Sequence, residues 1–164
     1  MQGQLSQKER MLLEDLKTQE DLCVIKYRSY AEQAKDPALK QLFTQISGME
    51  HQHYDTINQL LGGQTGAGRQ SGGQTAQMGQ SGNQAAGQIN LTQAQGSGGG
   101  NTDKYLLQDM LATEKYVSGA YDTGVFESSK PNIRQALQHI QKEEQNHGEQ
   151  LFQYMSSHGM YQVQ

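Results

Sequence analysis

Four glutamates and two histidines occur in this sequence as two copies of one pattern. Each copy is a single glutamate followed thirty residues later by a Glu-x-x-His motif, and the second copy follows the first by 94 positions throughout. The six residues are Glu20, Glu50, His53, Glu114, Glu144 and His147. A carboxylate and an imidazole three residues apart on a helix point the same way, so each motif can offer two ligands to one metal ion. Two such helices, with two further helices that give one glutamate each, form the ligand set of a di-metal four-helix bundle.

The 94-residue spacing extends well beyond the six candidate ligands. Shifting the chain by 94 residues aligns its two ends without a gap. Residues of the first half that meet an identical type include Leu12, Leu13, Asp15, Tyr27, Pro37, Gln41, Ile46 and Gln59. An internal repeat of this kind determines the architecture. Each half is therefore predicted to be one helical hairpin, with a pseudo-twofold axis between the two.

Four stretches have the apolar periodicity of amphipathic helices. They are predicted over Leu5–Lys35, Pro37–Leu61, Thr102–Ser129 and Pro131 to about Gly159. A capping box at Ser6-Gln7-Lys8-Glu9 starts the first helix, Asp36-Pro37 starts the second, and Thr102-Asp103 is predicted to cap the third. Gly119 and Gly124 weaken the third helix locally and indicate close packing there. The fold class is therefore all-α: a four-helix bundle made of two duplicated hairpins joined by a long flexible crossover linker.

The linker is predicted from a change in composition over residues 62–101. Gly, Gln, Ser, Ala and Asn dominate this segment, which cannot bury enough apolar surface to offset its ordering entropy. It separates an N-terminal hairpin (residues 1–61) from a C-terminal hairpin (residues 102–164), and the two hairpins are expected to form one bundle. A flexible chain of ~40 residues spans on the order of 35 Å, enough to cross the bundle from end to end.

The hairpin geometry places the six candidate ligands at one height. In the first hairpin, Glu20, Glu50 and His53 all lie about 20–25 Å from the turn at Asp36-Pro37, at 1.5 Å of rise per residue. The second hairpin repeats this arrangement around Lys130-Pro131. Four carboxylates in one apolar layer are costly to bury unless they are neutralised, and two divalent cations would offset their charge. The sequence therefore predicts a di-metal site.

Ligand chemistry narrows the choice of metal. Carboxylate-rich sites with one imidazole per ion favour iron or manganese, and zinc is possible by affinity. By the pattern of di-metal bundles, Glu50 and Glu144 are predicted to bridge the two ions, with Glu20 and Glu114 as end ligands. Tyr27 and Tyr121 are expected to be core tyrosines, because each lies about 10 Å along its helix from the glutamate of the same helix. No role is assigned to Glu143, Glu149, His51, His139 or His158.

Composition excludes several other classes of protein. The chain has 164 residues and a net charge of −4 with no basic stripe, so nucleic acid is an unexpected partner. No apolar run has the length of a membrane span, and the sequence after Met1 lacks signal-peptide character, so synthesis in a cytoplasm is expected. Cys23 is the single cysteine and cannot form an intrachain disulfide.

Three stretches of the C-terminal half resemble the coat F family of bacterial spore coat proteins. They run from Asp103 to Val117, from Ile133 to Gly148, and from Tyr154 to Tyr161. The repeated Glu and Glu-x-x-His pattern is also similar to that of the ferritin-like superfamily, in which bacterioferritins, rubrerythrins and manganese catalases use it. This resemblance implies a ferritin-like bundle, a location in the spore coat and other spore coat proteins as partners.

Two functions are open at this stage. The first is a structural coat protein in which any metal serves stability. The alternative is a di-iron or di-manganese oxidoreductase, of ferroxidase, peroxidase or catalase type, that protects the spore. A homodimer in which two chains exchange hairpins through the long linker is a further possibility.

Overall fold

Four α-helices make up the part of the chain that the structure, a computed structural model, describes, namely residues 4–63 and 100–161. The helices are α1 (Gln7–Gln33), α2 (Pro37–Leu61), α3 (Gly100–Glu127) and α4 (Pro131–Ser157). The all-α class and the two hairpins predicted from the sequence are confirmed. Of the predicted flexible linker over residues 62–101, residues 64–99 lie outside the described residues. Its predicted end is wrong by two residues, because residues 100 and 101 already belong to α3.

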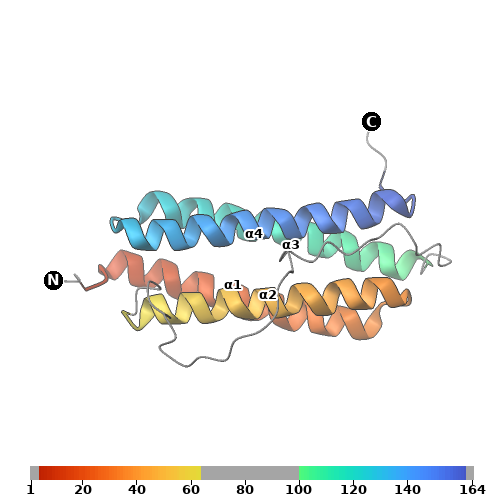
Figure 1. Cartoon of the computed structure of the whole chain (residues 1–164), viewed down its shortest axis with the longest axis horizontal. Coiled ribbons are helices and arrows are strands. Elements are labelled where there is room, and N and C mark those ends of the chain that lie inside the picture. The colour runs from red at the N-terminus through yellow and green to blue at the C-terminus, as the bar shows by residue number, and fades with distance from the viewer. Residues whose placement is uncertain (1–3, 64–99, 162–164) are drawn as a thin grey trace, which may run out of the picture.

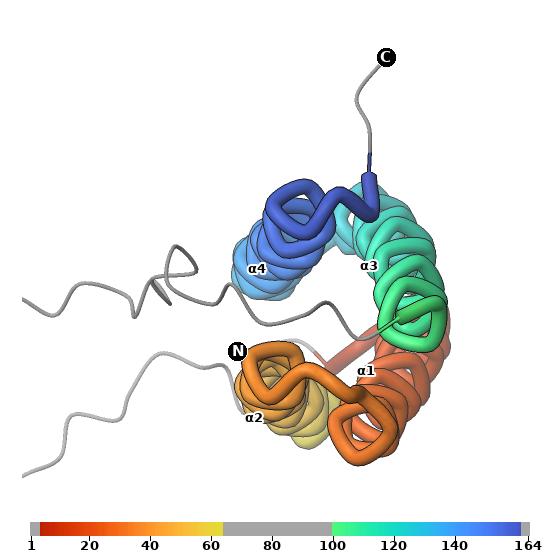
Figure 2. Tube along the Cα trace, turned by 90° about the vertical axis from the view of Figure 1, so that its right-hand side faces the viewer, coloured from red at the N-terminus to blue at the C-terminus, as the bar shows by residue number. Residues whose placement is uncertain are grey.

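The two hairpins lie side by side, so that the helices follow one another around the bundle in the order α1, α2, α4, α3 (Figures 1 and 2). Neighbouring helices are antiparallel. The Glu9 carboxylate near the start of α1 accepts a hydrogen bond from the Ser129 amide just after α3, at 3.0 Å. At the other end of the bundle, the Tyr154 hydroxyl of α4 donates to the Asp36 carboxylate before α2, at 2.7 Å. The end of α2 and the start of α3 therefore lie at opposite ends of the bundle, as a crossover connection requires.

Helix starts follow the predicted signals at three of the four helices. Ser6 and Glu9 form the capping box of α1, and the Asp36 side chain accepts from the Ala38 amide ahead of α2. Pro131 opens α4, although the side chain of Lys130 does not cap it. The predicted cap at Thr102-Asp103 is wrong, because α3 already begins at Gly100 and both residues lie within its first turn.

Asp103 has a different role, at the turn of the opposite hairpin. Its carboxylate accepts hydrogen bonds from the backbone amides of Lys35 at 2.8 Å and Asp36 at 3.0 Å, the turn between α1 and α2. Glu9, 94 residues earlier, does the same for the turn between α3 and α4. Each hairpin thus holds the turn of the other. These bonds also help to explain why α1 ends at Gln33, before the predicted Lys35.

Glu9 should contribute measurably to stability. Its carboxyl is 1% exposed and accepts from Ser6 as well as from Ser129. Glu9→Ala should lower the free energy of unfolding in urea by about 1–3 kcal/mol, because it leaves those donors without an acceptor. The matched control is Glu14→Ala, an exposed glutamate of the same helix, with an expected effect within about 0.5 kcal/mol. Equal effects of the two substitutions would contradict this role.

Two apolar clusters of buried side chains fill the bundle above and below the candidate ligands. One cluster lies toward the turn between α1 and α2 and includes Tyr27, Phe43 and Leu151. The other lies toward the turn between α3 and α4 and includes Leu16, Ile57 and Leu137. The polar residues of the repeat are therefore enclosed on both sides along the bundle axis. Within the described ranges, none of the helices combines the length and apolar character that a membrane span needs.

Of the two glycines in the interior of α3, Gly119 and Gly124, only Gly124 lies at a close helix contact. A Cβ atom there would meet the side chains of Leu137 at 3.2 Å and Leu16 at 3.3 Å, whereas a Cβ at Gly119 would meet no atom within 4 Å. Gly119→Ala should raise the free energy of unfolding by about 0.5–1 kcal/mol through helix propensity. Gly124→Val should lower it by about 1–3 kcal/mol through overpacking, again measured in urea. A stabilising Gly124→Val would show that the two leucines move aside freely.

Candidate metal centre

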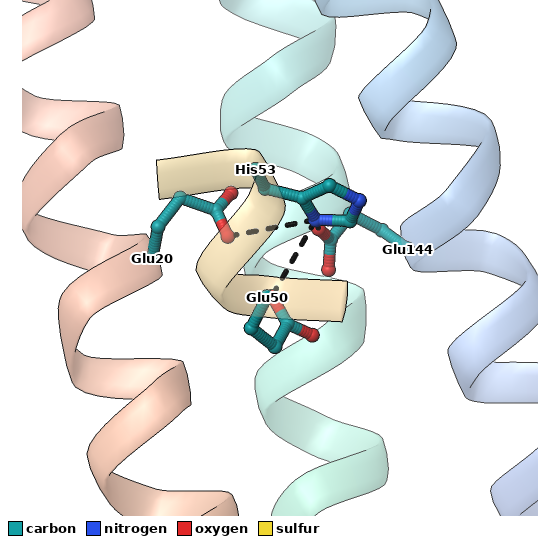
Figure 3. A group of neighbouring side chains, drawn as sticks. All are labelled: Glu20, Glu50, His53 and Glu144. Carbon is teal, nitrogen blue, oxygen red and sulfur yellow. Dashed lines mark ion pairs between the residues drawn. The ribbon is translucent and has the colours of Figure 1, made fainter. Parts of the chain in front are cut away.

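The six candidate ligands meet in one layer at the middle of the bundle. Glu20 comes from α1, Glu50 and His53 from α2, Glu114 from α3, and Glu144 and His147 from α4. All six are between 0% and 3% exposed. Figure 3 shows the acidic side chains of three helices converging on the imidazole of His53. The sequence-based prediction that all six meet at one height therefore matches where the structure places them.

The six residues form two overlapping groups whose ligand atoms lie within 4.8 Å of one another. One group consists of Glu20, Glu50, His53 and Glu144, and the other of Glu50, Glu114, Glu144 and His147. Glu50 and Glu144 belong to both groups. Membership of both groups is the position that the predicted bridge between two ions would need, and the bridging role stays a prediction. Glu20 and Glu114 each belong to one group, as end ligands would.

The histidines contact the two shared glutamates, Glu50 and Glu144, across the hairpins. His53 Nδ1 lies 2.8 Å from Glu144 Oε1, and His147 Nδ1 lies 2.9 Å from Glu50 Oε1. The two rings are stacked, with centroids 5.5 Å apart and planes inclined by 20°. These contacts are related by the pseudo-twofold axis of the repeat. In both copies Nδ1 is the ring atom that faces the glutamates of the ligand layer.

Several buried atoms in this layer have no hydrogen-bond partner among the described residues. They include Oε2 of Glu20, Glu50, Glu114 and Glu144. Oε1 of Glu50 and Oε1 of Glu144 instead lie within 2.9 Å of a histidine Nδ1. Buried polar groups in folded proteins are nearly always satisfied, and an unsatisfied one costs about 1–3 kcal/mol. These are also the oxygen and nitrogen atoms that a divalent iron or manganese ion would take. The donor set of this site therefore fits two metal ions.

Without metal, burial keeps protons on most of these carboxyls. It raises the pKa of Glu20 and of Glu144 to about 7 and that of Glu114 well above its ordinary value. Burial also opposes ionisation of Glu50, but the contacts with His147 and His53 outweigh it and lower the Glu50 pKa to about 2. Metal ions must displace the bound protons, so metal affinity should rise with pH.

Two tyrosines donate hydrogen bonds to Glu20 and Glu114, a role that the sequence analysis did not assign. The Tyr27 hydroxyl donates to Glu114 Oε1, and the Tyr121 hydroxyl donates to Glu20 Oε1. Each tyrosine reaches the glutamate of the other hairpin, which leaves Oε2 of both glutamates directed into the ligand layer. Both tyrosines are buried in the core, as expected. Each contacts the glutamate of the neighbouring helix, however, and not the glutamate of its own helix, to which the expectation referred. These contacts follow from the antiparallel pairing of α1 with α3, which the structure shows.

Removal of one tyrosine hydroxyl should therefore affect one end ligand. In Tyr121→Phe, the buried Glu20 Oε1 loses its donor, and the metal-free protein should unfold about 1–3 kcal/mol more easily in urea. Tyr116→Phe is the control, because Tyr116 is an exposed tyrosine of the same helix, 70% exposed. An equal effect of the two substitutions would contradict the positioning role of Tyr121.

Glu143 is a third residue whose contact with a candidate ligand the sequence analysis did not predict. Its carboxylate lies 2.9 Å from His53 Nε2 and 3.6 Å from His139 Nε2. The other residues without an assigned role stay outside the ligand layer. Glu149 accepts from Gln153, His51 lies 3.9 Å from Asp55, and His158 stacks on Tyr154. Nothing in the repeat marks Glu143, because the equivalent residue 94 positions earlier is Met49.

Comparison with known proteins gives a match over the second hairpin. The family model of the Coat F domain matches residues 102–164, which include nearly all of α3 and the whole of α4. No curated protein and no solved structure matches the chain. The match therefore covers three of the six candidate ligands, Glu114, Glu144 and His147, and the internal repeat relates them to the other three.

Proposed function

We propose that this chain is a structural component of a bacterial spore coat, and that two divalent metal ions hold its two hairpins together. The Coat F domain match over residues 102–164 supports the coat assignment. The coat is then the expected location, and other spore coat proteins are the expected partners. The ferritin-like relationship is part of the same proposal, and the repeated ligand pattern and the crossover between opposite bundle ends support it.

One observation carries the metal-binding part of this proposal. Most of the buried side-chain atoms without a hydrogen-bond partner belong to the residues of the two overlapping ligand groups. An ion among Glu20, Glu50, His53 and Glu144 would have ligands from both hairpins, because the first three lie on α1 and α2 and Glu144 lies on α4. The second group combines the hairpins in the same way. Metal binding would therefore stabilise the contact between the hairpins.

The chain's own residues define what the bound ions would do. Glu50 and Glu144 would bridge them, Glu20 and Glu114 would bind one ion each, and Tyr27 and Tyr121 would hold those end carboxylates in place. Iron or manganese bound there would bring redox chemistry in addition to charge. Such chemistry on an external substrate needs access to open positions. All six ligands are at most 3% exposed, and this burial favours the structural role over the oxidoreductase alternative.

The outer faces of α1 and α3 support contacts with partners. Large apolar side chains that are at least half exposed occur on these two neighbouring helices. They are Met11, Leu22, Ile25, Tyr105, Tyr116 and Phe126. Met11 and Tyr105 are equivalent in the repeat, as are Leu22 and Tyr116. The partner could be another coat protein or a second copy of this chain, including a hairpin-swapped dimer.

Metal analysis tests the metal-binding part. Protein loaded with Fe²⁺ under anaerobic conditions, or with Mn²⁺, and then desalted should retain about two ions per chain. Glu144→Ala should lose both because Glu144 belongs to both groups, while Glu20→Ala should retain about one. A metal content near zero in the native protein would contradict this part. The coat assignment is tested separately by immunodetection, which should find the protein in coat extracts of purified spores, and its absence there would overturn that assignment.

A further inference from the structure

The two halves of the ligand layer are nearly symmetric, but the surroundings of the two histidines are not. His53 Nε2 lies 2.9 Å from the Glu143 carboxylate. His147 Nε2 is buried and has no hydrogen-bond partner among the described residues. The repeat explains the difference, because the position equivalent to Glu143 is Met49, whose thioether is at best a weak acceptor. Met49 packs instead against the apolar cluster that contains Phe43.

The contact with Glu143 determines the state of the His53 ring. A carboxylate can only accept, so Nε2 must carry the proton and donate it to Glu143. In the neutral ring the lone pair then lies on Nδ1, which faces Glu144 Oε1 at 2.8 Å and Glu20 Oε2 at 3.6 Å. This is the form that binds a metal through Nδ1. A carboxylate on the far ring nitrogen also makes the ligand nitrogen more basic and fixes the orientation of the ring.

His147 lacks this support. To offer Nδ1 to a metal it must place a proton on Nε2, in a buried position where nothing in the described structure accepts it. The Glu143 side chain is 39% exposed, whereas the His53 side chain is 3% exposed. His139, one turn earlier on α4, lies 3.6 Å from the same carboxylate oxygen.

We infer that the two metal positions are unequal, and that Glu143 makes the position at Glu20 and His53 the tighter one. Glu143 is a positioning residue that acts through His53. This inference rests on the proposed binding of two metal ions. Loss of a hydrogen-bond partner of this kind typically costs about 10–100-fold in metal affinity, and that is the difference expected here.

Because Glu50 and Glu144 serve both positions, each position must be measured by itself. His147→Ala leaves the His53 position as the one with its full ligand set, and His53→Ala leaves the His147 position. The probe is Co²⁺, which accepts the same nitrogen and oxygen ligands, titrated in competition with a chelator of known affinity. In the His147→Ala protein, adding Glu143→Ala should weaken Co²⁺ binding by about 10–100-fold. In the His53→Ala protein, the same addition should change the affinity by less than about 2-fold.

Three further variants separate positioning from loss of charge. Glu149→Ala removes another carboxylate of α4, one that accepts from Gln153, and should leave both affinities unchanged. Glu143→Gln keeps an acceptor without the charge and should restore part of the lost affinity. Met49→Glu supplies the missing partner at the equivalent position and should tighten Co²⁺ binding in the His53→Ala protein. Circular dichroism of each metal-free variant checks that the bundle is folded.

The outcomes distinguish the inference from the proposed function. If the native chain binds no Co²⁺, the proposed function fails and this inference fails with it. If it binds two ions but Glu143→Ala weakens both positions equally, or neither, the inference is overturned and the proposed function stands. A loss confined to the position of His53, with partial rescue by Glu143→Gln, supports the inference.

Discussion

Saturation of both sites with metal should raise the midpoint of thermal unfolding by roughly 15–30 °C. A ligand that binds the folded state alone at a thousand times its Kd adds about 4 kcal/mol per site, so two sites add about 8 kcal/mol. A chain of this length gains about 2–4 °C for each kcal/mol. The effect is large because the same ions relieve the unsatisfied buried atoms of Glu50 and Glu144 and connect the hairpins. Calorimetry with and without a chelator measures it.

Three variants test which carboxylates are needed for this metal-induced stabilisation. Glu144→Ala should abolish the metal-induced rise, because that carboxylate belongs to both ligand groups. Glu20→Ala should retain about half of it. Glu149→Ala, which removes an acidic side chain of α4 that interacts with Gln153, should retain all of it. A similar rise in the Glu144→Ala protein would mean that the metal binds elsewhere on the chain.

The metal-free protein should lose stability as the pH rises from about 4.5 to about 7. Glu20 and Glu144 have pKa values of about 7 in the folded protein because they are buried, against 4.5 in the unfolded chain. Between these values the folded state binds more protons than the unfolded state, so stability falls with increasing pH. The rise from 4.5 to about 7 corresponds to a loss of about 3 kcal/mol for each carboxyl. Urea unfolding in the presence of a chelator, at a series of pH values, measures this loss.

The ionisation of Glu9 should make the stability of the protein rise with pH, in a lower pH range. Burial opposes its ionisation, but hydrogen bonds from Ser6 and Ser129 outweigh burial and lower its pKa to about 2. Its contribution is complete above pH 4.5 and is lost as the pH falls toward 2. The metal-free protein should therefore be most stable near pH 4–5. Glu20→Gln should reduce the loss of stability between pH 4.5 and 7 and should leave the loss of stability below pH 4.5 unchanged. A metal-free protein whose stability is flat from pH 4.5 to 7 would contradict the burial of protonated carboxyls.

The sequence was sufficient for the bundle because its signals were local or repeated. The capping box at Ser6 and the Asp36-Pro37 turn define helix boundaries through bonds between near neighbours. The six-residue pattern could be placed at one height because helix rise converts sequence distance into position along the axis. Neither inference requires knowledge of how the two hairpins face each other. The Asp103 cap failed because its partners, the amides of Lys35 and Asp36, belong to the other hairpin.

The surroundings of the ligands could not be predicted in the same way. Tyr27 reaches Glu114, and Glu143 reaches His53, only because helices from different hairpins are neighbours in the bundle. The contact of Glu143 depends on the packing of α2 against α4, and the repeat carries Met49 in its place. Residues that support a ligand from another helix become visible only when the hairpins are placed together.

The most direct test of the two-metal centre is anomalous diffraction from crystals of iron-loaded or manganese-loaded protein. The expected result is two anomalous peaks inside the bundle. One peak should lie beside Glu20 and His53, the other beside Glu114 and His147, with Glu50 and Glu144 between them. Data collected above and below the absorption edge of the loaded metal would identify the ions. The absence of any peak in this layer, or peaks confined to the protein surface, would contradict the central claim that these six residues form a metal centre.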